Sequence, residues 1–208
     1  MTTTKTQYDF ASKYTRVNWL TSFVLEKFYH SLFELLRLVP FTHNYYEIGC
    51  GEGFSSEKIN SFLKKNHPAT FTYNACDVED RLIIEAKKRN PALNITNQSV
   101  YDISKKLEKV DVIFLLEVLE HLEDPELALK EVLATNASYL ITSVPREPIW
   151  CFLNFIRGKY WTSWGNTPGH IQHWSRSAFL HLLQQYGEII SSKTPIPWTI
   201  VLVKLNKK

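Results

Sequence analysis

The sequence of 208 residues is poor in glycine, cysteine and methionine, with seven glycines, three cysteines and one methionine. The cysteines at positions 50, 76 and 151 are odd in number and widely spaced, which argues against a disulfide framework and predicts a reduced, cytoplasmic setting. No apolar run is longer than a strand, so we expect no transmembrane helix. The first residues (M-T-T-T-K) lack the apolar core of a signal peptide.

The sequence also lacks an excess of charge of one sign. Its net charge is +3, and acidic and basic residues are interspersed along the chain. A nucleic-acid partner is therefore not expected. With 44% hydrophobic and 22% charged residues, the composition is that of one globular domain with a proper core.

The few glycines are concentrated in one place. Three of the seven lie in the stretch E-I-G-C-G-E-G at 47–53, which follows a β-rich run and precedes a helical pattern at 54–63. Glycines in such a turn let a ligand approach the backbone, and the first turn of the helix offers unpaired N–H groups. The pattern is equally typical of a tight strand–helix connection, so its context has to decide.

The rest of the chain alternates between β-rich and helical segments. This alternation predicts a Rossmann-like α/β fold, in which helices cover both faces of a doubly wound, mostly parallel sheet. Strands are expected near 44–48, 70–76, 93–96, 110–116 and 138–144, with a terminal antiparallel pair at 188–191 and 198–205. In parallel sheets of this kind, ligands bind at the carboxyl ends of the strands.

Two helices flank this core. Residues 7–39 carry a long apolar face, which we interpret as packing on the sheet rather than as a lid. A second helix is expected at 176–186, with Ser175 as its N-cap and Gly187 just after its last turn.

The ligand of the glycine turn is indicated by two residues. A dinucleotide site needs a third small residue where this chain has Phe54, so that fingerprint fails. Asp77 stands at the end of the second strand, where an acid can accept hydrogen bonds from both ribose hydroxyls of S-adenosylmethionine. A helix N-cap is the alternative role for Asp77.

At this point the sequence resembles a known family. The ordered set E-I-G-C-G-E-G, Asp77, E-V-L-E-H-L-E-D-P at 117–125, S-V-P at 143–145 and G-H-I-Q-H-W-S at 169–175 is similar to the class I S-adenosylmethionine-dependent methyltransferases. The branch it resembles most contains small-molecule enzymes such as the ubiquinone-biosynthesis O-methyltransferases. The resemblance covers about residues 44–190.

The resemblance implies a set of cofactor-binding residues. It places the methionine end of the cofactor at the glycine turn, the ribose at the acid after strand two, and the sulfonium beside the end of strand four. Many members have an acid after strand three for the adenine, where this chain has a serine. The residues are Glu47, Gly49, Cys50, Gly51, Gly53, Asp77, Val78, Ser99, Val100, Glu117 and Val118.

The transfer itself is expected to be an in-line displacement, with S-adenosyl-L-homocysteine as the product. If the acceptor is a hydroxyl, a general base helps, and His121, His170 and His173 are the candidates because histidine titrates near neutral pH. Each of these histidines is equally well interpreted as structural.

The acceptor is expected to be a small molecule. The aromatic segment 148–174 indicates an aromatic or lipid-like acceptor, or simply a cap over the sheet edge; contact with a membrane surface is less expected. We therefore predict one domain with a helical layer at 1–40, a cofactor-binding core at 44–145, an acceptor-site insertion at 146–175 and a helix with a strand pair at 176–208. The oligomeric state is not indicated.

Two other functions remain open. Glu117, Glu120, His121 and one of His170 or His173 resemble the metal ligands of small-RNA 3′-terminal ribose 2′-O-methyltransferases. The main interpretation needs no metal ion. A non-catalytic binding protein that retains the fold is the other alternative.

Overall fold

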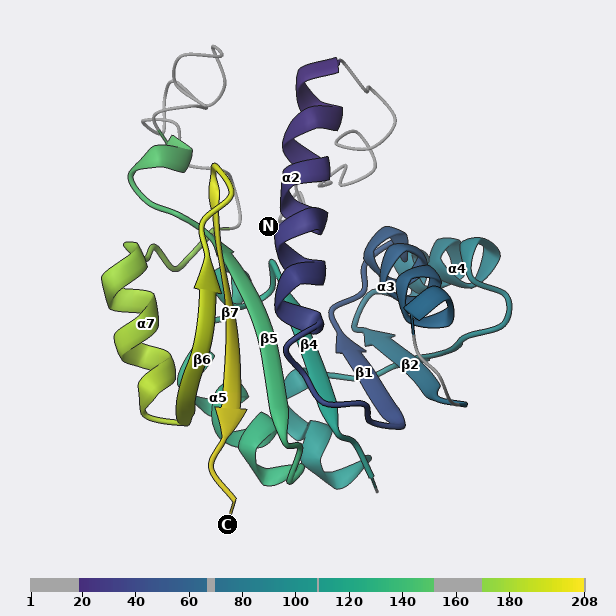
Figure 1. Cartoon of the computed structure of the whole chain (residues 1–208). Coiled ribbons are helices and arrows are strands. Elements are labelled where there is room, and N and C mark those ends of the chain that lie inside the picture. The colour runs from purple at the N-terminus through teal and green to yellow at the C-terminus, as the bar shows by residue number, and fades with distance from the viewer. Residues whose placement is uncertain (1–18, 67–69, 108, 152–169, 208) are drawn as a thin grey trace, which may run out of the picture.

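The computed structural model describes residues 19–66, 70–107, 109–151 and 170–207 (Figure 1). Its centre is a sheet of seven strands in the order β3-β2-β1-β4-β5-β7-β6. The first five strands are parallel, whereas β7 runs antiparallel to both β5 and β6. The predicted Rossmann-like sheet with a terminal antiparallel pair is thus confirmed. The strands are β1 Asn44–Ile48, β2 Thr72–Asp77, β3 Asn94–Asn97, β4 Val112–Leu116, β5 Tyr139–Pro145, β6 Gly187–Lys193 and β7 Trp198–Leu205.

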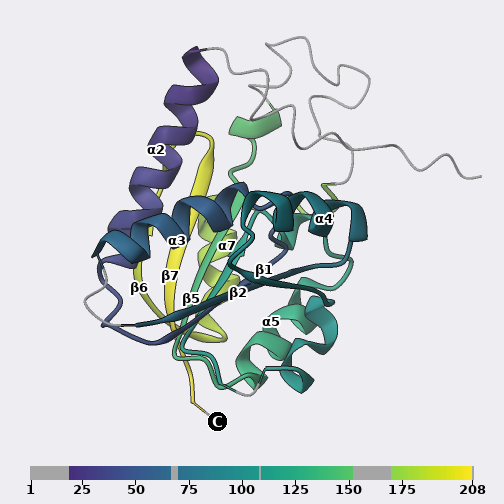
Figure 2. The same cartoon turned by 90° about the vertical axis from the view of Figure 1, so that its right-hand side faces the viewer.

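Helices cover both faces of this sheet (Figure 2). One buried cluster joins α2 and α3 to the sheet, and another joins α5 and α7 to its opposite face. Strand β4 lies between them and is buried at all five positions, as its apolar sequence predicts. The helices are α2 Trp19–Leu36, α3 Phe54–Asn66, α4 Asp80–Arg89, α5 Pro125–Ala134 and α7 Arg176–Gln184, with short 3₁₀ helices η1 Val100–Lys105 and η2 Leu119–His121.

Helix α2 packs on the sheet. Leu32 and Leu35 are completely buried, and the ring of Phe28 meets that of Trp198 edge-on with centroids 5.0 Å apart. This agrees with the packing role expected for residues 7–39, of which 7–18 lie outside the described residues. No helix of the described part of the chain is long and apolar enough to cross a membrane.

The prediction that Gly187 ends a helix is wrong. Helix α7 is capped by Gln185, and Gly187 opens β6. The glycine is needed because a Cβ there would overlap the carbonyl oxygen of Lys204 on β7. Its role is close strand approach rather than a left-handed turn.

Most of the predicted acceptor-site insertion at 146–175 lies outside the described residues, since 152–169 are not described. Its two flanks are described, and both reach the carboxyl end of the sheet. The backbone N–H of Glu147 donates to the carbonyl oxygen of Trp174 at 3.0 Å, which ties one flank to the other.

Candidate cofactor and acceptor site

The glycine turn after β1 is fixed by both backbone and packing constraints. Gly49, Gly51 and Gly53 all have positive φ, of 74°, 54° and 79°. A Cβ on Gly49 would lie 2.5 Å from a methyl carbon of Val118, so the end of β4 comes as close as a glycine permits. The N–H of Gly49 donates to the carbonyl oxygen of Cys76 at 2.8 Å, which holds the turn against β2.

The far end of the turn is held by α4. The side-chain amide of Asn90 donates to the carbonyl oxygen of Gly53 at 2.9 Å, and a Cβ on Gly53 would lie 2.6 Å from the same nitrogen. The next residue, Phe54, begins α3, and the guanidinium of Arg89 lies 3.5 Å from its ring centroid. Phe54 therefore occupies the position where a dinucleotide site needs a small residue.

Asp77 joins the end of β2 to the same turn. Its Oδ2 accepts from the N–H of Gly51 at 2.8 Å, and its Oδ1 accepts from the N–H groups of Val78 and Glu79 at 2.8 and 3.0 Å. The N-cap residue of α4 is Glu79, whose side chain makes no capping bond. Asp77 therefore does not cap the helix, and the alternative role considered for it is not what the structure shows.

A cavity of about 460 Å³ opens at the carboxyl ends of the strands. This volume lies within the range of about 300–1,000 Å³ that is usual for small-molecule sites. Most of the predicted cofactor-binding residues line it, together with one of the three histidines. Those that do so are Gly49, Cys50, Gly51, Asp77, Val78, Ser99, Val100, Glu117, Val118 and His121.

Glu47 and Gly53 are predicted residues that do not line this cavity. Glu47 is 1% exposed and accepts hydrogen bonds from the hydroxyls of Ser55, Ser56 and Tyr73. Burial raises the pKa of the Glu47 carboxyl above its ordinary value, against the opposing effect of these hydroxyl donors. The structure thus places Glu47 beneath the turn, where it ties β1 to the first turn of α3 and to β2.

The adenine end of the predicted site has a polar and an apolar side. The Ser99 hydroxyl accepts from the N–H of Tyr101 at 3.2 Å and caps η1, while Gln98 donates to the carboxylate of Asp102. A hydroxyl that accepts one bond can still donate its own proton. Val78 lines the cavity and is 60% exposed, so an apolar surface is available there for a flat ring.

Several cavity-lining residues were missed at the level of the sequence. Phe28 and Tyr29 of α2 line the cavity as well as packing on the sheet, and Gln98 and Tyr101 line it after β3. The apolar face of 7–39 was the available signal for the first two. For Gln98 and Tyr101, only their position after a predicted strand could have indicated that they line the cavity.

Glu117 has a strained backbone and a tightly held side chain. It is one of two non-glycine residues with positive φ in the described part of the chain, at 57°. Its carboxylate accepts from the Ser143 hydroxyl at 2.9 Å and from the indole N–H of Trp198 at 2.6 Å. Such strain is typically kept where the surroundings fix a functional side chain.

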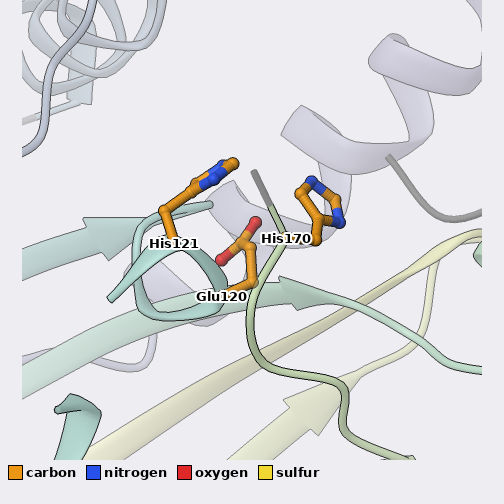
Figure 3. A group of neighbouring side chains, drawn as sticks. All are labelled: Glu120, His121 and His170. Atoms are coloured by element: carbon orange, nitrogen blue, oxygen red, sulfur yellow. The ribbon is translucent and has the colours of Figure 1, made fainter. Parts of the chain in front are cut away.

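Beyond Glu117, η2 brings Glu120 and His121 next to His170 (Figure 3). The two imidazole rings meet edge-on with centroids 4.9 Å apart, and one ligand atom from each of the three side chains lies within 4.8 Å of the others. The N–H groups of Ile171 and Gln172 donate to the Glu120 carbonyl oxygen at 2.8 and 3.0 Å. These backbone hydrogen bonds hold His170 beside η2, which follows β4.

His173 lies elsewhere. Its Nδ1 is 3.4 Å from Oε1 of Glu147, and it does not line the cavity. Of the three predicted histidines, the structure therefore brings His121 to the cavity, places His170 against His121 outside the cavity lining, and places His173 beside Glu147.

This arrangement can be compared with known proteins. Residues 25–188 match the protein family described as "Methyltransferase domain". The chain belongs to this family. The family match and the shared fold make it a member of the class I S-adenosylmethionine-dependent methyltransferases. S-adenosylmethionine is therefore its methyl donor and S-adenosylhomocysteine the product. A comparison of the methyltransferase sequence with curated proteins gives no match.

Solved structures share the fold of the methyltransferase at low identity. Magnesium protoporphyrin IX methyltransferase from Synechocystis PCC 6803, determined with bound S-adenosylhomocysteine, is 14% identical with a TM-score of 0.66, and the match covers 94% of each chain. A methyltransferase from Thermotoga maritima is 15% identical with a TM-score of 0.65, covering 94% of this chain and 95% of that one. The small RNA methyltransferase HEN1 is 17% identical with a TM-score of 0.61 over 86% of this chain, which spans only 25% of the HEN1 chain.

Proposed function

We propose that this methyltransferase transfers a methyl group to a hydroxyl of a small, aromatic or lipid-like acceptor, as the ubiquinone-type branch does. The observation that carries the proposal is the lining of the cavity just described. The glycine turn and Asp77 line it, and so do Glu117 and His121 from the loop after β4. A donor and an acceptor hydroxyl can therefore share one cavity.

The donor end fits S-adenosylmethionine in its polarity. Asp77 is 8% exposed yet lines the cavity, so its carboxylate is a buried acceptor suited to ribose hydroxyls. The backbone of Gly49 and Gly51 is open to the methionine end, and Val78 and Val100 offer apolar contact to adenine. When bound, S-adenosylmethionine supplies a methyl group already activated on a sulfonium, so positioning and exclusion of water contribute much of the rate.

The acceptor end fits a hydroxyl on an apolar molecule. His121 lines the cavity and is the residue we assign as general base, with His170 beside it. Phe28 and Tyr29 form an aromatic part of the cavity wall. Trp150, which does not line the cavity, stacks on His170 with centroids 5.8 Å apart. Such a wall suits a flat or lipidic acceptor better than a charged one.

Calorimetry and kinetics on paired variants test this proposal. Asp77→Ala is expected to weaken S-adenosylmethionine binding at least tenfold, whereas His121→Ala is expected to lower turnover by about 10²-fold or more with nearly unchanged cofactor affinity. The matched control is His181→Ala, an exposed histidine of α7. Wild-type protein that fails to bind S-adenosylmethionine would instead support the non-catalytic alternative, and equal losses of affinity and turnover in His121→Ala would make that histidine structural.

A metal-assisted reaction is a second candidate, favoured by the cluster of Glu120, His121 and His170. One carboxylate and two imidazoles are suitable ligands for a divalent cation such as Mn²⁺, and Glu117 stands three residues before Glu120 on the same loop. A cation bound there would activate the acceptor hydroxyl by lowering its pKa. In that case no histidine would be needed as the general base. The RNA 3′-terminal ribose is the acceptor to test first in this case, since HEN1 shares the fold.

Chelation separates the two candidates. If a cation takes part, treatment with a chelator abolishes turnover, Mn²⁺ restores it, and His170→Ala raises the Mn²⁺ concentration needed. Activity that is indifferent to the chelator excludes the metal-assisted reaction and leaves His121 as the base. A panel of phenols, polyprenyl alcohols and RNA 3′ ends then identifies the acceptor class.

Three further proposals concern the surroundings of the enzyme. We expect no nucleic-acid partner under the first candidate, and no membrane contact beyond what a lipid-like acceptor itself requires.

We also propose a cytoplasmic location, supported by the three free cysteines, two of which are buried. The division into a cofactor-binding core at 44–145 and an acceptor-site insertion at 146–175 remains a prediction.

A further inference from the structure

A second group of metal-ligating side chains lies outside the cavity. Glu147, Cys151 and His173 each offer one ligand atom, and these atoms lie within 4.8 Å of one another. The imidazole Nδ1 of His173 is 3.4 Å from Oε1 of Glu147, and the other carboxylate oxygen accepts from the backbone N–H of Cys151 at 3.2 Å. None of the three side chains lines the cavity described above.

The backbone brings these residues together without a ligand. After β5 the chain enters a helical turn, in which Trp150 N–H donates to the carbonyl oxygen of Arg146 at 3.0 Å. A spacing of four residues then places Cys151 on the same side of the turn as Glu147. The bridge between Arg146 and Trp174 brings His173, from the other flank, alongside. Two segments more than 20 residues apart thus present their donors to one point.

The donor set selects a particular kind of cation. A thiolate, an imidazole and a carboxylate together are ligands typical of Zn²⁺, whereas Mg²⁺ and Ca²⁺ prefer oxygen donors alone. Zinc with three protein ligands keeps a fourth position for water, which is accessible here because the His173 side chain is 38% exposed. The Glu147 side chain is 13% exposed, so the site is sheltered on its carboxylate side.

We propose that Glu147, Cys151 and His173 bind a zinc ion that joins the two flanks of segment 152–169. Cys151 immediately precedes this segment and His173 follows it by four residues, so the ion links the described residues on its two sides. The ion bridges the two flanks in this role, with water as its fourth ligand. It is distinct from the cation considered at Glu120, His121 and His170, a cluster that contains no sulfur.

Cobalt substitution tests the site directly, because a thiolate bound to Co²⁺ gives an intense charge-transfer band in the near ultraviolet that nitrogen and oxygen ligands do not give. Titration of the metal-free full-length protein with Co²⁺ is expected to produce this band with a stoichiometry of one, and Zn²⁺ is expected to displace it. Cys151→Ser should abolish the band although Cys50 and Cys76 remain. His173→Ala and Glu147→Gln should each raise the Co²⁺ dissociation constant at least tenfold.

Two controls make the result specific. His181→Ala removes an exposed histidine of α7 and should leave the band unchanged, as should His121→Ala, which alters only the sulfur-free cluster. Circular dichroism establishes that each variant is folded, and Zn²⁺ should raise the melting temperature of wild type more than that of Cys151→Ser. A wild-type protein without the band, or a band that persists in Cys151→Ser, overturns the zinc site while leaving the methyltransferase proposal untouched.

Discussion

The indole N–H of Trp198 donates to Oε2 of Glu117 at 2.6 Å, across 81 residues of sequence. Trp198 is the first residue of β7 and lies opposite Pro145, the last residue of β5. Glu117 follows β4, the next strand of the sheet. The terminal antiparallel strand therefore does more than complete the sheet, because it supplies a donor that orients a carboxylate at the wall of the cofactor cavity.

Trp198→Phe removes this donor and keeps most of the ring. A hydrogen bond to a charged group contributes about 1.5–3 kcal/mol to stability, so the free energy of unfolding is expected to fall by about this amount. Because Glu117 lines the cavity and loses a donor that positions it, turnover is expected to fall about tenfold as well. Ser143→Ala removes the other side-chain donor to Glu117 and should act in the same direction. If both act through Glu117, the double variant loses less than the product of the single losses, which a double-mutant cycle of kcat values measures. Fully multiplicative losses would contradict this coupling.

The contact between Glu117 and Trp198 could be predicted only in part from the sequence, because it depends on the register in which β5 and β7 pair. The apolar run at 110–116 predicts β4 closely, and the β-rich run at 198–205 predicts β7 at both ends. The sequence does not show that Trp198 faces Pro145, because strand pairing and register depend on contacts between distant segments. The fold class therefore follows from local patterns, whereas the partners of Glu117 do not.

The histidines illustrate the same limit. His170 and His173 stand three residues apart before α7, and their sequence context is equally consistent with either as a base. The distinction comes from the backbone bonds of Ile171 and Gln172 to Glu120, which direct one imidazole toward the cavity loop and leave the other beside Glu147. An irregular segment carries no periodicity from which this could be read.

Asp77→Asn is expected to weaken S-adenosylmethionine binding at least tenfold. An amide keeps the shape and one acceptor, but it loses a negative charge and turns a donor toward either the cofactor or the N–H of Gly51. Calorimetric titration measures the change. Asp80→Asn serves as the matched control, because Asp80 is an exposed acid at the start of α4 that does not line the cavity. Equal affinities for wild type and Asp77→Asn would remove Asp77 from the ribose site.

The first two glycines of the turn should differ in their tolerance of alanine. Both have positive φ, which costs an alanine about 1–2 kcal/mol. At Gly51 nothing lies within 4 Å of an added Cβ, so this cost is the whole effect, whereas at Gly49 the overlap with Val118 adds about 1–3 kcal/mol of overpacking. Urea unfolding should therefore rank Gly49→Ala below Gly51→Ala in stability. Adding Val118→Ala should recover part of the loss only in the Gly49→Ala background, and a reversed ranking would contradict the close approach of β4.

The last prediction concerns the pH dependence of stability and rests on Glu47. Burial raises its pKa in the folded protein above the ordinary value of 4.5. Between these two values the native state binds more protons than the unfolded state, so the free energy of unfolding decreases as the pH rises through this interval. Glu47→Gln removes the ionisation, since a glutamine can accept from the same hydroxyls without carrying a buried charge. Its stability relative to wild type should therefore increase as the pH rises above about 4.5 and level off once Glu47 is ionised in the native state.

Urea unfolding of wild type and Glu47→Gln across this pH range measures the difference. Glu57→Gln is the matched control, because Glu57 is an exposed acid in the first turn of α3, the helix whose Ser55 and Ser56 bond to Glu47. The stability difference between Glu57→Gln and wild type should vary much less with pH. A difference for Glu47→Gln that instead decreases with rising pH would mean that the hydroxyls of Ser55, Ser56 and Tyr73 outweigh burial. In that case the ionised carboxylate of Glu47 would stabilise the contact between β1 and α3, and the glycine turn would be more stable with Glu47 charged than with Glu47 neutral.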